Sequence, residues 1–140
     1  MTGTRGCVFC DIVAGRAAAH VVLDEARALA FLDVRPLFPG HVLLVPKAHV
    51  ETLADLPEAD VGPLYLHAQR LARAVEAAME ADGSFVAQNN KVSQSVPHLH
   101  VHVVPRKKKD GLRGFFWPRT KYESDAAAAE IAARIRARLV

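Results

Sequence analysis

Three classes of protein are excluded by what this sequence of 140 residues lacks. No apolar run approaches the roughly 20 residues that a bilayer-spanning helix needs, and the first residues lack the charged and then hydrophobic layout of a signal peptide. Two cysteines are too few for the disulfide framework of a small secreted protein. A formal net charge of +3 favours anionic ligands but falls short of a nucleic-acid-binding surface. We therefore expect a cytoplasmic protein that binds neither membrane nor nucleic acid.

The distribution of apolar residues predicts an α+β fold in a single domain. Between Pro57 and Met79 the apolar positions recur at three- and four-residue spacing, which predicts one long amphipathic helix. A second helix is expected over residues 124–139 at the C-terminal end. Short apolar or β-branched runs predict five strands, over residues 21–23, 28–32, 41–46, 85–88 and 98–104. We expect a sheet of about five mostly antiparallel strands with the long helix packed on one side.

Three histidines alternate with apolar residues in the last predicted strand. Because strand side chains point to opposite faces in turn, His98, His100 and His102 should project from one face. A core strand has no structural use for three polar rings that each need hydrogen-bond partners, so the pattern predicts a functional site. Such rings can ligate a metal ion, or a neutral imidazole can attack phosphorus and hold a covalent nucleotidyl group. Isolated histidines such as His41 and His67 are expected to be ordinary structural or surface residues.

The residues in and around this strand resemble the histidine-triad family. Residues 98–104 match its H-φ-H-φ-H-φ-φ signature, in which φ is a hydrophobic residue, and the preceding Gln-Ser-Val-Pro at 94–97 is also typical. Other segments follow in the order and approximate spacing of the family's bacterial branch, namely residues 7–15, 31–36, 39–41 and 46–49. The resemblance implies one domain over 1–140, with a core at 7–106 and a C-terminal extension at 107–140. It also implies a homodimer.

The resemblance implies a hydrolase or transferase that cleaves a nucleoside phosphoramidate or a dinucleoside polyphosphate. His100, the middle histidine of the signature, is the implied nucleophile, and a backbone carbonyl would hold its other ring nitrogen. His98 completes the triad, His102 would contact the scissile phosphate and assist the leaving group, and Ser95 would hydrogen-bond a phosphate oxygen or the leaving atom. Two other classes remain open, a nucleotide-binding or scaffold protein with incidental catalysis and a zinc-dependent hydrolase whose metal activates water.

The resemblance further implies a pocket for a purine nucleotide of the adenosine or guanosine type. Asp33 would accept hydrogen bonds from the ribose hydroxyls, since a carboxylate suits a vicinal diol. Apolar side chains would form the walls around the base, namely Phe9, Ile12, Phe31 and Val34. Asn89 and Gln94 are the implied polar contacts, Asn89 on the phosphate side. Plain core packing is the alternative role for Phe31 and Val34.

The cysteine pair, Cys7 and Cys10, has the spacing C-x-x-C and three interpretations: a redox motif, two ordinary thiols, or half of a tetrahedral zinc site. A thioredoxin-like motif would require a following βαβ unit, which the sequence pattern does not show. In zinc-containing members of the family the other ligands correspond to His49 and His98. We therefore predict one structural Zn²⁺ and no organic cofactor. Without metal, His49 and His98 would share a hydrogen bond and support His100.

Two further segments allow a structural or a functional role. The basic run at 106–109 is either a solvated loop or a surface that steers phosphate-bearing substrates. Residues 111–119 contain three aromatic residues and two arginines, and these either anchor the tail to the core or cover a bound nucleotide as a lid.

Overall fold

The computed structural model describes residues 6–112 and 119–139, so most of the aromatic segment expected as an anchor or lid, 113–118, lies outside the described residues. The chain divides into two compact units, residues 1–110 and 111–140. The first unit contains α1 (Val8–Val13), β1 (Val21–Asp24), β2 (Ala28–Leu32), β3 (Val42–Pro46), the 3₁₀ helix η1 (Leu53–Asp55), α2 (Glu58–Ala78), β4 (Gly83–Ala87) and β5 (Val101–Arg106). The second contains α3 (Asp125–Arg136). Among the described helices, none combines the length and the apolar character that crossing a bilayer requires.

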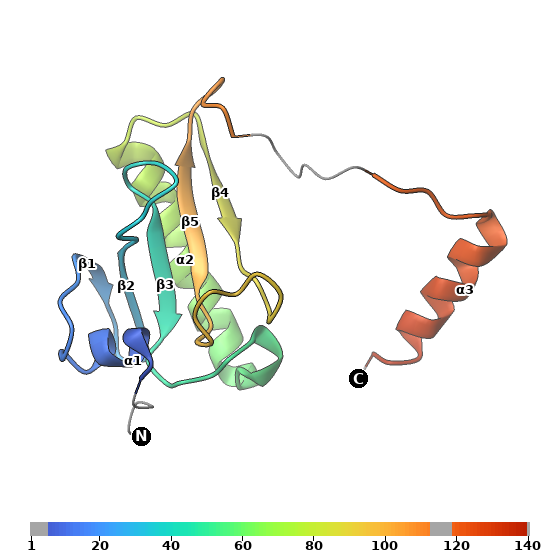
Figure 1. Ribbon diagram of the computed structural model, residues 1–140, viewed down its shortest axis with the longest axis horizontal. Coiled ribbons are helices and arrows are strands. Elements are labelled where there is room, and N and C mark those ends of the chain that lie inside the picture. The colour runs from blue at the N-terminus through green and yellow to red at the C-terminus, as the bar shows by residue number, and fades with distance from the viewer. Residues whose placement is uncertain (1–5, 113–118, 140) are drawn as a thin grey trace. The chain divides into compact units, whose positions relative to one another are not determined.

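The five strands form one antiparallel sheet in the order β1-β2-β3-β5-β4 (Figure 1). Strand β5 is therefore an interior strand, and its His102 pairs with Leu43 of β3 on one side and with Ala87 of β4 on the other. Figure 1 shows α2 behind this sheet and α1 at the lower ends of β2 and β3. The α+β fold, the five antiparallel strands and the long helix expected from the sequence are confirmed.

Each face of the sheet has its own hydrophobic core. On one face, α2 contributes the buried residues Leu64, Ala68, Leu71 and Val75, which pack with Ala30, Leu44, Leu99, Val101 and Val103 of the sheet and its approach. On the other face, α1 packs Phe9 and Cys10 against Phe31, Leu43 and Val45. Strands β2 and β3 are thus covered on both sides, which explains why their sequences are continuously apolar and not alternating.

Strand β5 begins three residues later than expected. The prediction placed the strand at 98–104, but regular pairing starts at Val101, and the Leu99 N–H donates instead to Val50 O at 2.7 Å. The alternation of faces nevertheless continues through this segment, because Leu99 lies in the α2 core whereas the rings of His98 and His100 contact Phe9 of α1. The strand boundary was wrong, and the expected common face of the histidines is confirmed.

The short helix α1 was not expected from the sequence, since six residues carry too little periodicity to be recognised. Cys7 caps it, and its Sγ accepts from the Cys10 N–H at 3.4 Å. In the second unit, α3 begins after Ser124, whose Oγ accepts from the Ala127 N–H at 3.0 Å and so caps the helix.

Candidate functional site

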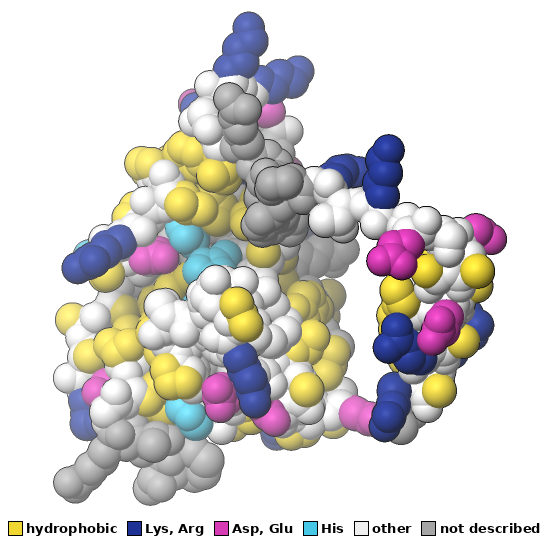
Figure 2. Space-filling view, turned by 45° about the vertical axis from the view of Figure 1, so that its right-hand side comes forward, with side chains coloured by type: hydrophobic (Ala, Val, Ile, Leu, Met, Phe, Trp, Pro, Cys, Tyr) yellow, Lys and Arg dark blue, Asp and Glu magenta, His cyan; other side chains and the backbone are white. Residues whose placement is uncertain are grey.

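A cavity of about 290 Å³ opens on the α1 face of the sheet. Its lining includes eight of the residues predicted for the nucleotide site and the catalytic centre, namely Phe9, Ile12, Phe31, Asp33, Val34, Ser95, His100 and His102. These residues come from α1, from the end of β2, from the segment before β5 and from β5 itself. On the face drawn in Figure 2, histidine side chains reach the surface beside an acidic side chain and among hydrophobic ones. The fold therefore brings an apolar slot, a carboxylate and two imidazoles to one place.

His100 is held with one ring nitrogen free for chemistry. Its Nδ1 lies 2.7 Å from the backbone carbonyl oxygen of His98, and a carbonyl can only accept, so Nδ1 carries the proton. In the neutral ring Nε2 then carries the lone pair. The imidazole is buried, and the edge-on ring of Phe9 packs against it with centroids 5.0 Å apart. The contact that the sequence led us to expect for a nucleophilic histidine is present.

His102 is paired with His41, a histidine that the sequence led us to expect as an ordinary structural or surface residue. His41 is buried at 3% exposure, and its Nε2 lies 2.9 Å from Nδ1 of His102. Burial, reinforced by the neighbouring His100 and His41, lowers the pKa of His102 to about 4, and burial also lowers the pKa of His41. Both rings are therefore neutral near pH 7. His41 stands in the Pro-Gly-His segment of the resemblance, which was the only signal that set it apart from an ordinary histidine.

Asp33 faces the pocket from the end of β2. Its Oδ1 accepts from the backbone N–H of Arg35 at 2.8 Å, and its Oδ2 lies 3.6 Å from Nε2 of His41. The side chain is 20% exposed, so the carboxylate is positioned by the loop and still open to a ligand. Phe31 serves both core and wall, since it is buried and also lines the cavity. Val34 is 87% exposed and lies at the rim, not in the core.

Asn89 and Gln94, the predicted polar contacts of the nucleotide, do not line this cavity. Their side chains form hydrogen bonds within the loop that precedes β5 and, for Gln94, also with the segment between β3 and η1. Gln94 donates from Nε2 to the carbonyl of Glu51 at 2.7 Å and accepts at Oε1 from the N–H of Lys91 at 2.8 Å. Asn89 donates from Nδ2 to the carbonyl of Ser93 at 3.2 Å. In this structure both residues shape the loop, and their contact with a nucleotide stays a prediction.

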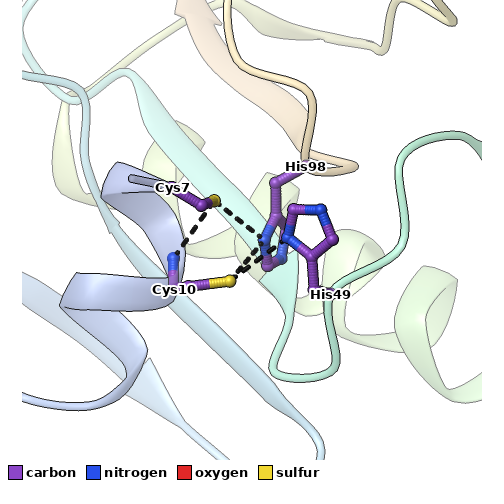
Figure 3. Close-up of side chains that lie close together, drawn as sticks. All are labelled: Cys7, Cys10, His49 and His98. Atoms are coloured by element: carbon purple, nitrogen blue, oxygen red, sulfur yellow. Dashed lines mark hydrogen bonds between the residues drawn. The ribbon is translucent and has the colours of Figure 1, made fainter. Parts of the chain in front are cut away.

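The four predicted zinc ligands converge beside the pocket. Cys7 and Cys10 of α1 face His98, which precedes β5, and His49, which follows β3 (Figure 3). One ligand atom from each residue lies within 4.8 Å of all the others. Cys7 and Cys10 are not joined in a disulfide, and Sγ of Cys10 lies 3.2 Å from Nδ1 of His49 and 3.5 Å from Nδ1 of His98. Zinc–ligand bonds of about 2.0–2.3 Å in a tetrahedron would separate sulfur and nitrogen by about 3.5 Å, so the residues present fit a metal ion.

The tautomer of His98 also fits a metal ligand. Its Nε2 lies 2.8 Å from the carbonyl oxygen of Pro46 and must donate to it, which leaves the lone pair on Nδ1, the nitrogen that faces the two sulfurs. Burial lowers the pKa of His98, which favours this neutral form. The alternative without metal had His49 and His98 sharing a hydrogen bond. Instead both rings direct Nδ1 toward Cys10, with their planes at 89°.

The chain was compared with known proteins. A family model described as the HIT domain matches residues 14–109. The chain is 34% identical to the adenosine 5′-monophosphoramidase of Saccharomyces cerevisiae over 123 residues, and the aligned region covers 85% of this chain and 74% of that protein. A crystal structure of a HIT family member from Bacillus subtilis superposes with a TM-score of 0.89 at 29% identity, over 97% of this chain and 99% of that one. A zinc-bound histidine triad family protein from Mycobacterium smegmatis superposes with a TM-score of 0.74 at 37% identity, over 94% and 99% of the two chains.

Proposed function

We propose that this chain, which belongs to the histidine-triad (HIT) family, hydrolyses nucleoside 5′-phosphoramidates with His100 as the nucleophile. The observation that carries the proposal is the contact between His100 Nδ1 and the carbonyl of His98, since it leaves the lone pair on Nε2 of a ring that lines the pocket. The name of the yeast relative supports a P–N bond as the target.

The reaction would proceed in two displacements at phosphorus. Nε2 of His100 attacks the α-phosphorus, a bond forms between nitrogen and phosphorus, and the bond to the leaving amine breaks as the amine gains a proton. Water then attacks the same phosphorus and releases a proton. The bond between Nε2 of His100 and phosphorus breaks, and the nucleoside monophosphate departs. Asp33 would hold the ribose hydroxyls and the aromatic slot the base, so that the phosphorus lies over the imidazole.

The lining of the pocket supports an amine as leaving group in preference to a polyphosphate. Among the described residues that line the cavity there is no lysine or arginine. Cleaving a dinucleoside polyphosphate would place several additional negative charges beside the site, and such groups are usually bound by Arg, Lys or a metal ion. A neutral amine requires no such partner.

We propose Zn²⁺ as the ion held by Cys7, Cys10, His49 and His98. Thiolate and imidazole together suit this ion, and a relative that matches over most of both chains is described as zinc-bound. Four protein ligands close the coordination sphere, so the ion would serve structure by tying α1 to the segment before β5.

A substrate panel tests the proposal. Purified protein should release AMP from adenosine 5′-phosphoramidate faster than from diadenosine tetraphosphate, and His100→Asn should lose this activity while His67→Asn, altered on α2, retains it. Nucleotide binding without turnover of either compound would contradict the proposal and favour a binding or scaffold protein. Activity that disappears with the metal while the fold persists would favour a zinc-dependent hydrolase.

A further inference from the structure

We propose that His41 is a positioning residue, whose hydrogen bond fixes His102 in the tautomer that presents Nε2–H to the substrate. The inference rests on the proposed function in one respect, that His102 acts on the bound substrate. It is carried by two consecutive hydrogen bonds, which begin at the backbone N–H of Leu37 and end at His102 in the lining of the pocket.

The order of donors along this chain is set by its first member. The backbone N–H of Leu37 can only donate, and it lies 3.0 Å from Nδ1 of His41. Nδ1 of His41 must therefore carry a lone pair, and in the neutral ring the proton is on Nε2. That Nε2–H donates to Nδ1 of His102 at 2.9 Å, so the neutral His102 carries its own proton on Nε2. One backbone amide thus determines the proton positions of two imidazoles.

His41 has little freedom to turn away from this arrangement. Its backbone N–H donates to Phe38 O at 3.1 Å, and its carbonyl accepts from the Asp33 N–H at 2.9 Å, which closes the loop between β2 and β3. The ring is buried, packed against His102 with centroids 5.2 Å apart. The carboxylate of Asp33, with Oδ2 at 3.6 Å from Nε2 of His41, is farther away than the nitrogen of His102.

The same side chains also satisfy the distance criterion for a metal site. Ligand atoms of Asp33, His41 and His102 lie within 4.8 Å of one another. A metal ion here would need the lone pair of His41 on Nε2, but that nitrogen carries the proton while Nδ1 accepts from Leu37. The geometry therefore favours a hydrogen-bonded chain over ion binding at this place.

The free end of the chain lies where the leaving group must depart. His102 lines the cavity, its ring centroid is 5.0 Å from that of His100, and the described residues offer its Nε2 no hydrogen-bond partner. A fixed Nε2–H can donate to a phosphoryl oxygen or to the leaving atom in every molecule. Without His41, His102 would divide between two tautomers, and only one of them presents this donor to the substrate.

Two substitutions separate positioning from packing. In His41→Gln the side-chain amide retains an N–H donor for His102, whereas His41→Leu fills a similar volume with no donor. His67→Leu serves as a matched histidine control on α2. The ¹⁵N shifts of the His102 ring, measured by NMR without substrate, should show Nε2 protonated in the wild type and in His41→Gln, and a mixture of tautomers in His41→Leu. In steady-state assays His41→Leu should lose about tenfold or more in kcat with KM within about threefold, and His41→Gln should recover most of the loss.

The NMR measurement does not depend on catalytic activity, because it is made without substrate. A wild-type His102 protonated at Nδ1, or a His41→Leu spectrum with Nε2 still fully protonated, would overturn the positioning role, and the wild-type spectrum decides this even if His41→Leu does not fold. Equal kcat losses in His41→Gln and His41→Leu would also overturn it. Failure of the wild type to cleave any phosphoramidate, with the expected tautomer observed, would instead overturn the proposed function.

Discussion

His98 supports two neighbours with different atoms. Its backbone carbonyl accepts from His100 Nδ1 and so sets the tautomer of the proposed nucleophile, while its imidazole faces the cysteines with Nδ1 and donates to Pro46 O with Nε2. A substitution or loss of ligand at the His98 imidazole is therefore expected to alter the position of His100, because the backbone carbonyl of His98 holds the His100 ring. The candidate metal site and the proposed nucleophile are thus connected by a single amino acid.

At Asp33 we predict an effect on ribose binding. Asp33→Asn keeps an oxygen for the Arg35 N–H but removes the negative charge, so the affinity for AMP should fall by about 1–3 kcal/mol. Titration calorimetry with AMP and with its 2′,3′-dideoxy analogue provides the measurement. The analogue lacks the ribose diol, so its affinity should change much less. An equal loss of affinity for both ligands would mean that Asp33 only stabilises the loop.

The depressed pKa of His102 predicts how stability depends on pH. The folded protein protonates this ring near pH 4, whereas the unfolded chain does so near the ordinary value of 6.5. Between these values the unfolded state binds more protons, so the contribution is fully present above about pH 6.5 and is lost as the pH falls toward 4. Urea midpoints at pH 7 and pH 5 should differ less in His102→Gln than in the wild type. The same difference in both proteins would contradict this assignment.

At the scale of elements, the turn before β3 places His41. Gly40 has φ of +95°, a conformation that other residues adopt with strain, and an added Cβ would lie 2.6 Å from Cγ of Met79 and 3.2 Å from Cγ of Pro105. We predict that Gly40→Ala lowers the free energy of unfolding by about 1–3 kcal/mol. Gly62→Ala is the matched control, because Gly62 lies inside α2 with open space around it and should gain about 0.5–1 kcal/mol. An unchanged urea midpoint in Gly40→Ala would show that the turn tolerates a side chain.

The sequence predicts those elements whose burial follows a clear period. The long helix was expected over 57–79 and is observed over Glu58–Ala78. It was predictable because its apolar residues recur with the helical period and all pack against one face of the sheet. Strand β5 was misplaced by three residues, since the apolar alternation continues into a segment whose backbone bonds to Val50 and not to the sheet. Helix α1 was missed because its six residues span fewer than two turns.

Those parts of the site that belong to a sequence motif could be predicted. The contacts that form only when distant strands pair could not. The four residues of the cysteine cluster and most residues of the pocket were named in advance, and the structure brings these together, whereas Asn89 and Gln94 lie outside the pocket lining. The role of His41 requires its contact with His102, 61 residues away, which exists only once β3 and β5 have paired. A motif likewise does not show that Gln94 bonds to Lys91 in its own loop and to Glu51 in the segment after β3.

At the scale of the whole molecule, the candidate metal site joins segments that are far apart in sequence. It connects α1, the segment after β3 and the segment before β5 in one cluster (Figure 3). A metal ion that binds only the folded state adds its binding free energy to folding. We predict one zinc per chain and, on chelation, a fall of at least about 5 °C in melting temperature.

Elemental analysis and calorimetry of protein prepared without added zinc provide the measurement. In Cys7→Ala/Cys10→Ala the zinc should be absent and the chelator should no longer change the melting temperature. Zinc retained by this double variant, or metal-free wild type that melts at the same temperature as loaded protein, would contradict the assignment.

The central claim is that His100 forms a bond to the nucleotide. Wild-type protein mixed with adenosine 5′-phosphoramidate, quenched within the first turnover and mapped by mass spectrometry, should carry one adenylyl group on His100. The group should be absent from His100→Asn and should disappear from the wild type as AMP is formed. Full turnover by the wild type with no adduct at any time, together with turnover retained in His100→Asn, would contradict the covalent mechanism.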